Sequence, residues 1–155
     1  MFGYRYGLEY ICSYTLTLRP EVIGPLPEGI RINFHITGGE VNGPKLHGRF
    51  RPVGADFMIQ RSDGVAVLDI RATIETHDGA LIYEVGSGLS YSPEGGHEGA
   101  MKEGLPLTTP VRVAIRLSTA HPEYLWVNRL QFIAIAESNR DRDEVEVRAD
   151  LYALK

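Results

Sequence analysis

Two carboxylates and one guanidinium have the types and spacing that suit acid–base chemistry. Asp69 and Arg71 lie two apart in segment 65–76, where polar and apolar residues alternate. Successive side chains of a β-strand point to opposite faces, so Asp69 and Arg71 share one face. If that face lines a cavity, the guanidinium keeps one carboxylate ionised while a second acts as general acid or base. On a surface, the same pattern is a ladder of ion pairs worth about 0.5 kcal/mol each.

A second acid, Asp56, joins this pair in only one strand register. A two-residue turn at Asp63-Gly64 places Asp56 opposite Arg71, which brings the three charged side chains together. A three-residue turn that begins at Ser62 places Ala55 opposite Arg71 instead and separates them. The sequence leaves both registers open, because Asp-Gly suits either turn.

An aromatic segment supplies a second group of candidates. The pattern over 125–137 predicts a strand on which Trp126, Asn128 and Phe132 share one face. We interpret that face as a pocket wall, with the amide of Asn128 as a hydrogen-bonding hook for a substrate oxygen. The alternative is a packed core in which Asn128 satisfies a bend in the backbone.

Three further side chains complete the candidate site. Tyr83 is a possible proton donor, although a two-residue Asp78-Gly79 turn places it on the face opposite Asp69. His47 lies in a glycine-rich corner, and Met58 is an apolar neighbour of Asp56. The predicted catalytic residues are therefore Asp69, Arg71, Asp56, Asn128 and Tyr83, and the predicted substrate-binding residues are Trp126, Met58, Phe132 and His47.

Sequence motifs for several other chemistries are missing. We find no phosphate-binding loop, dinucleotide fingerprint, nucleophile elbow, HExxH or CxxC motif. The five histidines share no metal-ligand spacing. We therefore expect neither a metal nor a cofactor.

Composition indicates one globular domain spanning 1–155. The 155 residues are 43% hydrophobic and 23% charged, with a net charge of −4. A mildly acidic chain has no electrostatic footprint for nucleic acid or an anionic membrane. No apolar run is long enough to span a bilayer and no signal peptide is visible, so we expect a cytoplasmic protein.

The elements that position these candidates read as β-strands. Period-two alternation predicts about nine strands, near 8–18, 30–37, 45–51, 55–61, 65–76, 80–87, 111–118, 125–137 and 144–154. Asp-Gly turns link several of them as antiparallel neighbours. Strands in this number hide their edges in a barrel or a sandwich, and the glycines at Gly38, Gly39 and Gly54 favour sharp barrel corners. We therefore predict an all-β fold, a single antiparallel β-barrel of about eight to nine strands. The irregular stretch from Gly88 to Pro110 is interpreted as a mobile loop near its mouth.

Several short motifs occur in a familiar order. They are TGGEVNGPKLHG at 37–48, GAD at 54–56, RSDG at 61–64, LDIR at 68–71, THDGALIY at 76–83 and YLWVNR at 124–129. This series resembles the DUF3237 family, also called UPF0311, over about residues 30–136. The resemblance implies a small antiparallel barrel similar to the allene-oxide-cyclase and dirigent barrels. The chain departs from the family pattern at Phe57, where we expect Trp, and over 88–110, which predicts a specialised ligand-facing loop.

These observations favour a cofactor-independent enzyme of isomerase, cyclase, lyase or hydrolase type. Its substrate would be an apolar or aromatic oxygenated metabolite in the barrel cavity, with Asp69 or Asp56 as acid or base. The alternatives are a non-catalytic ligand-binding barrel and a structural oligomer, and a homo-oligomer is possible in each case. A lumen containing Asp69 and Arg71 would favour the enzyme, an entirely apolar lumen a carrier, and a filled lumen a structural role.

Overall fold

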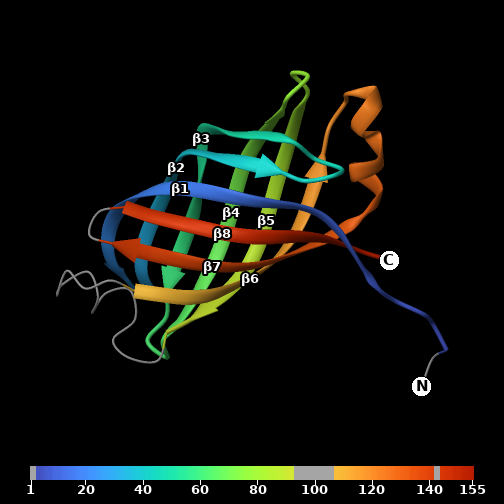
Figure 1. Ribbon diagram of the computed structural model, residues 1–155. Coiled ribbons are helices and arrows are strands. Elements are labelled where there is room, and N and C mark those ends of the chain that lie inside the picture. The colour runs from blue at the N-terminus through green and yellow to red at the C-terminus, as the bar shows by residue number, and fades with distance from the viewer. Residues whose placement is uncertain (1–2, 93–106, 142–143) are drawn as a thin grey trace.

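A closed antiparallel β-barrel forms most of the described structure. The computed structural model describes residues 3–92, 107–141 and 144–155. Each strand pairs with the next, and the last pairs with the first, so the sheet closes on itself (Figure 1). The strands are β1 (Leu8–Leu26), β2 (Gly29–Asn42), β3 (Gly48–Gln60), β4 (Val65–Thr76), β5 (Leu81–Tyr91), β6 (Leu107–Ser118), β7 (Gln131–Asp141) and β8 (Glu144–Leu154). The predicted all-β barrel is confirmed.

The alternation of the strands separates an inner from an outer face. On β6, for example, Val111, Val113, Ile115 and Leu117 are buried, whereas Arg112 and Arg116, which alternate with them, are exposed. One half of the interior is filled by large apolar side chains with almost no accessible surface, among them Phe50, Ile74, Ile82, Ile115, Phe132 and Leu151. The other half, toward the β3–β4 turn and the ends of β5 and β7, contains the cavity described below.

Both Asp-Gly hairpins use three-residue turns. The amide of Arg61 donates to the carbonyl of Val65 at 2.8 Å, and that of Thr76 donates to Ala80 at 2.9 Å. Gly64 and Gly79 close these turns with φ of +84° and +87°, a conformation that glycine adopts at little cost. A three-residue turn with glycine in the left-handed position is a common hairpin link. The second of the two registers considered for β3 and β4 is therefore the one that forms.

The start of the predicted strand 125–137 is wrong. Residues Pro122–Arg129 form a 3-10 helix, η1, and β7 begins only at Gln131. Pro122 opens the first turn, where its missing amide hydrogen costs nothing. Asn128 accepts the amide hydrogen of Thr119 at 2.8 Å and donates to its carbonyl at 2.9 Å, which ties the helix to the end of β6. The alternating aromatic residues of this segment thus imitate a strand without forming one.

Other boundaries differ in smaller ways. The predicted strands 45–51 and 55–61 are the single strand β3, which gives eight strands, because an irregularity between Phe50 and Gly54 interrupts its ladder with β4 without ending the strand. Of the predicted loop Gly88–Pro110, residues 88–91 and 107–110 belong to β5 and β6. Residues 93–106 lie outside the described residues. None of the helical residues described forms a segment long and apolar enough to cross a bilayer.

Candidate functional site

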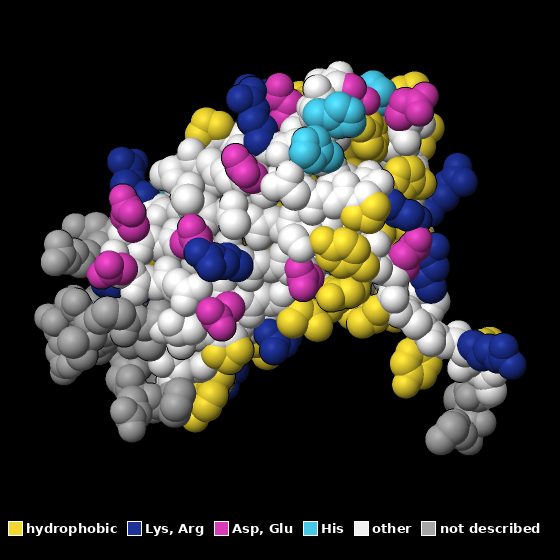
Figure 2. Space-filling model, in the orientation of Figure 1, with side chains coloured by type: hydrophobic (Ala, Val, Ile, Leu, Met, Phe, Trp, Pro, Cys, Tyr) yellow, Lys and Arg dark blue, Asp and Glu magenta, His cyan; other side chains and the backbone are white. Residues whose placement is uncertain are grey.

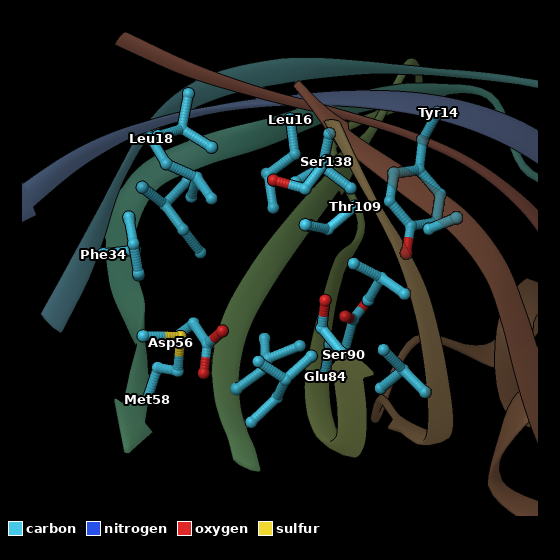
Figure 3. Close-up of a pocket in the computed structure, with 18 residues that line it drawn as sticks. Tyr14, Leu16, Leu18, Phe34, Asp56, Met58, Glu84, Ser90, Thr109 and Ser138 are labelled. Atoms are coloured by element: carbon cyan, nitrogen blue, oxygen red, sulfur yellow. The ribbon is translucent and has the colours of Figure 1, made fainter. Parts of the chain in front are cut away.

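A cavity lies inside the barrel, in the half that the large apolar side chains leave unfilled. Its volume is about 60 Å³. Eighteen side chains from all eight strands line it, and most are apolar (Figure 3). Its polar members are Tyr14, Asp56, Glu84, Ser90, Thr109 and Ser138. An apolar cavity with a few converging polar groups is the usual form of a small-molecule site.

Asp56 reaches the cavity from β3 and is held by the neighbouring strand. Its Oδ1 atom accepts the backbone amide hydrogen of Asp69 on β4 at 2.9 Å. Burial raises the pKa of Asp56 to about 7, although the hydrogen bond from Asp69 and the charge of Arg31 oppose this shift. One carboxylate oxygen is therefore anchored in the barrel wall, while the carboxyl group as a whole faces the lumen (Figure 3).

Glu84 reaches the same cavity from β5, but without such support. The residue is 3% exposed, and its Oε2 atom has no hydrogen-bond partner among the described residues. Burial alone raises the pKa of Glu84 to about 7. A carboxyl group in this environment carries a proton at neutral pH about as often as not, because burial removes the solvation of its charged form.

Tyr14 on β1 adds a phenol to the inner end of the cavity. Its ring packs edge-on against Phe50, with 5.2 Å between the ring centroids. Burial raises the pKa of Tyr14 well above its ordinary value, and the nearby charge of Glu84 raises it further. Tyr14 therefore remains a neutral hydrogen-bond donor throughout the physiological range.

The predicted cluster of Asp56, Asp69 and Arg71 does not form. The three-residue turn sets Ala55 opposite Arg71, so Asp69 and Arg71 lie on the outer face while Asp56 faces inward. Asp69 and Arg71 form an ion pair there, with side chains 56% and 38% exposed. Acidic and basic side chains are interspersed across the face shown in Figure 2 in the same way. The arrangement matches the surface ladder that was the alternative to a site.

Tyr83 and His47 also lie outside the cavity. The three-residue turn places Tyr83 opposite Thr73, so it shares the outer face with Asp69, contrary to the register expected from a two-residue turn. It is 46% exposed. His47 is exposed near the β4–β5 turn, where its ring contacts that of His77 at 5.6 Å between centroids.

The four remaining candidates, Met58, Phe132, Trp126 and Asn128, lie in different parts of the barrel. Met58 lines the cavity next to Asp56, as a substrate-binding residue would. Phe132 points inward but belongs to the filled half of the barrel, where it packs against Trp126 of η1. Lys45 lies 5.9 Å from the centre of the Trp126 ring on its outer side. Asn128 is exposed and bound to Thr119, so the predicted pocket wall does not exist.

The sequence analysis missed Glu84, Tyr14 and the three hydroxyl residues. The signal for Glu84 was the alternation of β5, because Ile82 and Glu84 share a face and a buried Ile82 implies a buried Glu84. Within the described ranges, no group of three or more His, Cys, Asp or Glu side chains is arranged to hold a metal ion.

Comparison with known proteins identifies the family. The sequence pattern described as "Protein of unknown function (DUF3237)" matches residues 6–154. The chain belongs to the DUF3237 family. The UPF0311 protein RPA1785 of Rhodopseudomonas palustris is 33% identical over 146 residues, which cover 90% of this chain and 95% of that protein. The resemblance read from the sequence motifs is confirmed.

Solved structures share the DUF3237 barrel. The crystal structure of RPA1785 has a TM-score of 0.75 at 30% identity, covering 96% of this chain and 99% of that one. A β-barrel-like protein of Acinetobacter baumannii has a TM-score of 0.77 at 28% identity over the full length of both chains. A structure of Penicillium herquei described as an enzyme has a TM-score of 0.65 at 20% identity, covering 96% and 99% of the two chains. At that identity the likeness concerns the fold alone.

Proposed function

We propose that this DUF3237 barrel is a cofactor-independent acid–base enzyme for a small, apolar or aromatic, oxygen-bearing molecule. The observation that carries the proposal is the pair Asp56 and Glu84, two carboxyl groups in one apolar lumen, each with a pKa of about 7. A pKa near the working pH is what a group needs in order both to take up and to release a proton. Perturbed carboxyl groups in a cavity are also a common mark of catalytic sites.

The surroundings of the two acids support different roles. The Asp69 amide stabilises the ionised form of Asp56, so Asp56 is the proposed general base. Glu84 has no such donor for its Oε2 atom, so its protonated form is favoured and it is the proposed general acid. Tyr14, which stays neutral, is the proposed donor to a carbonyl or enolate oxygen.

This assignment favours reactions that need only proton transfer and shape. The base removes a proton from carbon or oxygen, the donors stabilise the resulting oxyanion, and the acid returns a proton at another position. Isomerisation, cyclisation and elimination fit this scheme. Arg71 and Asn128, which lie away from the cavity, have no part in it.

Two observations weigh against the other candidate functions. The lumen holds an open cavity, which disfavours a purely structural barrel. Two buried carboxyl groups are costly in a simple carrier for apolar molecules, because such a carrier has no use for them. The Penicillium herquei structure, described as an enzyme, supports the view that a barrel of this fold can house catalysis.

Deuterium incorporation from solvent tests the proposal without knowledge of the natural substrate. Small enolisable ketones such as 2-tetralone are incubated with the protein in D2O, and mass spectrometry follows the exchange of their α-hydrogens. We expect the wild-type protein to accelerate exchange without any added cofactor. Asp56→Asn and Glu84→Gln should each reduce the acceleration by about 10²–10⁴-fold.

Asp69→Asn is the matched control, because it removes a carboxylate from the outer face and leaves the backbone donor to Asp56 in place. Its exchange rate should stay close to that of the wild type, because burial is the main cause of the raised pKa of Asp56 and the charge of Asp69 adds only a smaller part. If the wild type accelerates exchange of no ketone in the panel, or if Glu84→Gln retains full acceleration, the proposed function is wrong.

A further inference from the structure

Three hydroxyl side chains form a polar strip on the lumen wall near one end of the barrel. Ser90 lies one residue before the end of β5, Thr109 lies two residues after the start of β6, and Ser138 lies three residues before the end of β7. Thr109 pairs directly with Ser138, and Ser90 pairs with Val111, two residues from Thr109. Side chains in such direct and diagonal positions are close neighbours. We call these three residues the hydroxyl belt.

The belt is deeply buried, and two of its three hydroxyl groups have no partner among the described residues. Ser90 is 4% exposed, Thr109 is 2% exposed and Ser138 is 7% exposed. The hydroxyl oxygens of Ser90 and Thr109 have no hydrogen-bond partner among the described residues. Buried polar side chains are rarely left in this condition, and each instance requires an explanation. All three face the cavity, so a group inside the cavity can supply the missing bonds (Figure 3).

The opposite wall of the cavity is apolar. Strands β1, β2 and β4 contribute Leu16, Leu18, Phe34, Ile36, Leu68 and Ile70, and carry no polar lining side chain beyond Tyr14. Hydrogen-bonding groups therefore lie mainly along β5, β6 and β7, with Asp56 as the exception on β3. A molecule that matches both walls has oxygen atoms along one edge and hydrocarbon along the other.

The charge of the lining restricts the occupant further. Among the described residues that line the cavity there are two carboxyl groups and no Lys, Arg or His. Among these described lining residues, a carboxylate or phosphate ligand would meet two acidic groups and no cation. Hydroxyl groups can both donate and accept, so the belt suits neutral hydroxyl or carbonyl groups.

We propose that the hydroxyl belt is the recognition subsite for a neutral, amphipathic ligand that carries hydroxyl or carbonyl oxygen along one edge. This inference deepens the proposed function and rests on it for placing the substrate in the lumen. The apolar body of the ligand packs against β1, β2 and β4, and its oxygen-bearing edge bonds the belt. Asp56 and Glu84 then lie further from the strand ends, beside the part of the molecule that reacts.

Matched probes test the subsite through binding alone. NMR titration compares 2-naphthol with naphthalene, which differ by one hydroxyl group, in the wild type and in a Ser90→Ala/Thr109→Val variant. We expect the wild type to prefer 2-naphthol by about fivefold, the contribution of one neutral hydrogen bond. The variant should lose this preference and keep its affinity for naphthalene. Asp69→Asn, which changes only the outer face, should retain the preference, and Glu84→Gln is titrated alongside it.

Thermal unfolding separates a binding role from a structural one. Thr109→Val replaces a hydroxyl that has no partner among the described residues by a methyl group of similar shape, so the melting temperature should stay constant or rise. Thr76→Val is the control, because Thr76 is also buried but accepts the amide hydrogen of Ala80 at 2.9 Å. That control should melt at a lower temperature. A clear drop for Thr109→Val would instead assign the belt to the framework and overturn the proposal.

The other results of these binding experiments also test the subsite. Equal affinity for both probes, an unchanged preference in the double variant, or no binding of either probe to the wild type overturns the subsite. Tighter binding of 2-naphthoate or 1-naphthylmethylamine overturns the neutral character of the ligand. A preference that disappears only in Glu84→Gln overturns the belt and leaves the proposed chemistry intact. If the preference depends on the belt but no deuterium exchange occurs, the subsite is supported and the proposed chemistry is wrong.

Discussion

Asp56 and Glu84 illustrate how one cavity can hold two acids in different states. Both lose the solvation of their charged forms, which raises both pKa values to about 7. Asp56 recovers part of this loss through a backbone donor, whereas the Oε2 atom of Glu84 has no partner among the described residues. The burial that prepares these groups for proton transfer also destabilises the folded state when they ionise.

The pH dependence of the unfolding free energy should reveal this destabilisation. In the unfolded chain these carboxyl groups titrate near their ordinary pKa values of 3.8 for Asp56 and 4.5 for Glu84. Because the folded pKa values are higher, the native state binds more protons between about pH 4 and pH 7. The stabilisation associated with the protonated groups is complete below pH 4 and disappears as the pH rises through 7. Each group should account for a loss on the order of 3 kcal/mol over this range.

Urea unfolding at pH 4.5 and 7.5 measures this contribution. Glu84→Gln cannot ionise, so the difference in unfolding free energy between variant and wild type should favour the variant increasingly as the pH rises. Using this difference removes the titration of the surface carboxylates, which the two proteins share. Parallel pH profiles for wild type and variant would show that Glu84 is not buried as an acid.

At the scale of elements, turn length decides which side chains share a face. Both Asp-Gly hairpins contain one residue more than the shortest option, and this shift places Asp69, Arg71 and Tyr83 together on the outer surface. The register between β3 and β4 then shifts between Phe50 and Gly54, and Asp56 follows two residues later. A local change of backbone in this corner therefore affects the position of a candidate catalytic carboxyl group.

Gly54 should be the most sensitive point of that corner. Its φ is +93°, and an added Cβ atom would lie 2.1 Å from the carbonyl oxygen of Arg71 on the neighbouring strand. Gly54→Ala must therefore distort the β3–β4 pairing. We expect it to lower the unfolding free energy by about 2–3 kcal/mol. Gly79→Ala provides the comparison, since its φ is +87° but nothing lies within 4 Å of the added atom. It should cost only about 1 kcal/mol. Equal effects in chemical denaturation would contradict the role of the close contact.

The elements also show what the sequence could and could not predict. Alternation and Asp-Gly turns were sufficient for an antiparallel barrel, because both are local signals of burial and backbone conformation. The sequence could not distinguish two-residue from three-residue turns, and that uncertainty determined whether Asp56 shared a face with Asp69 and Arg71. At 122–129, alternating Tyr124 and Trp126 suggested a strand, whereas Pro122 and the Asn128–Thr119 hydrogen bonds stabilise a 3-10 helix. Asp56 and Met58 were recovered as cavity residues because they share a face in either register.

On the scale of the whole molecule, the barrel has a filled half and a hollow half. An eight-stranded barrel is just wide enough for its inner side chains to fill it, so a cavity requires small or missing side chains. On β5 the inward positions between Glu84 and Ser90 are Gly86 and Gly88, and the β7 side chains that line the cavity are Ala136 and Ser138. The large side chains are concentrated in the half that carries η1. This division gives the molecule a rigid base on which the polar groups of the cavity are held.

Two alanines on one strand provide a direct test of this division. Ala134 and Ala136 both face inward on β7, but Ala134 is 0% exposed in the filled half, whereas Ala136 lines the cavity. Ala134→Leu adds volume where none is available and should destabilise the protein by about 1–3 kcal/mol or more. Ala136→Leu should leave the unfolding free energy within about 1 kcal/mol of the wild type, because its added atoms enter open space and bury apolar surface. The same variant should no longer bind naphthalene, since the leucine occupies the volume that the ligand needs. Equal destabilisation by both substitutions, with naphthalene still bound by Ala136→Leu, would mean that the ligand space lies elsewhere than in this half of the barrel.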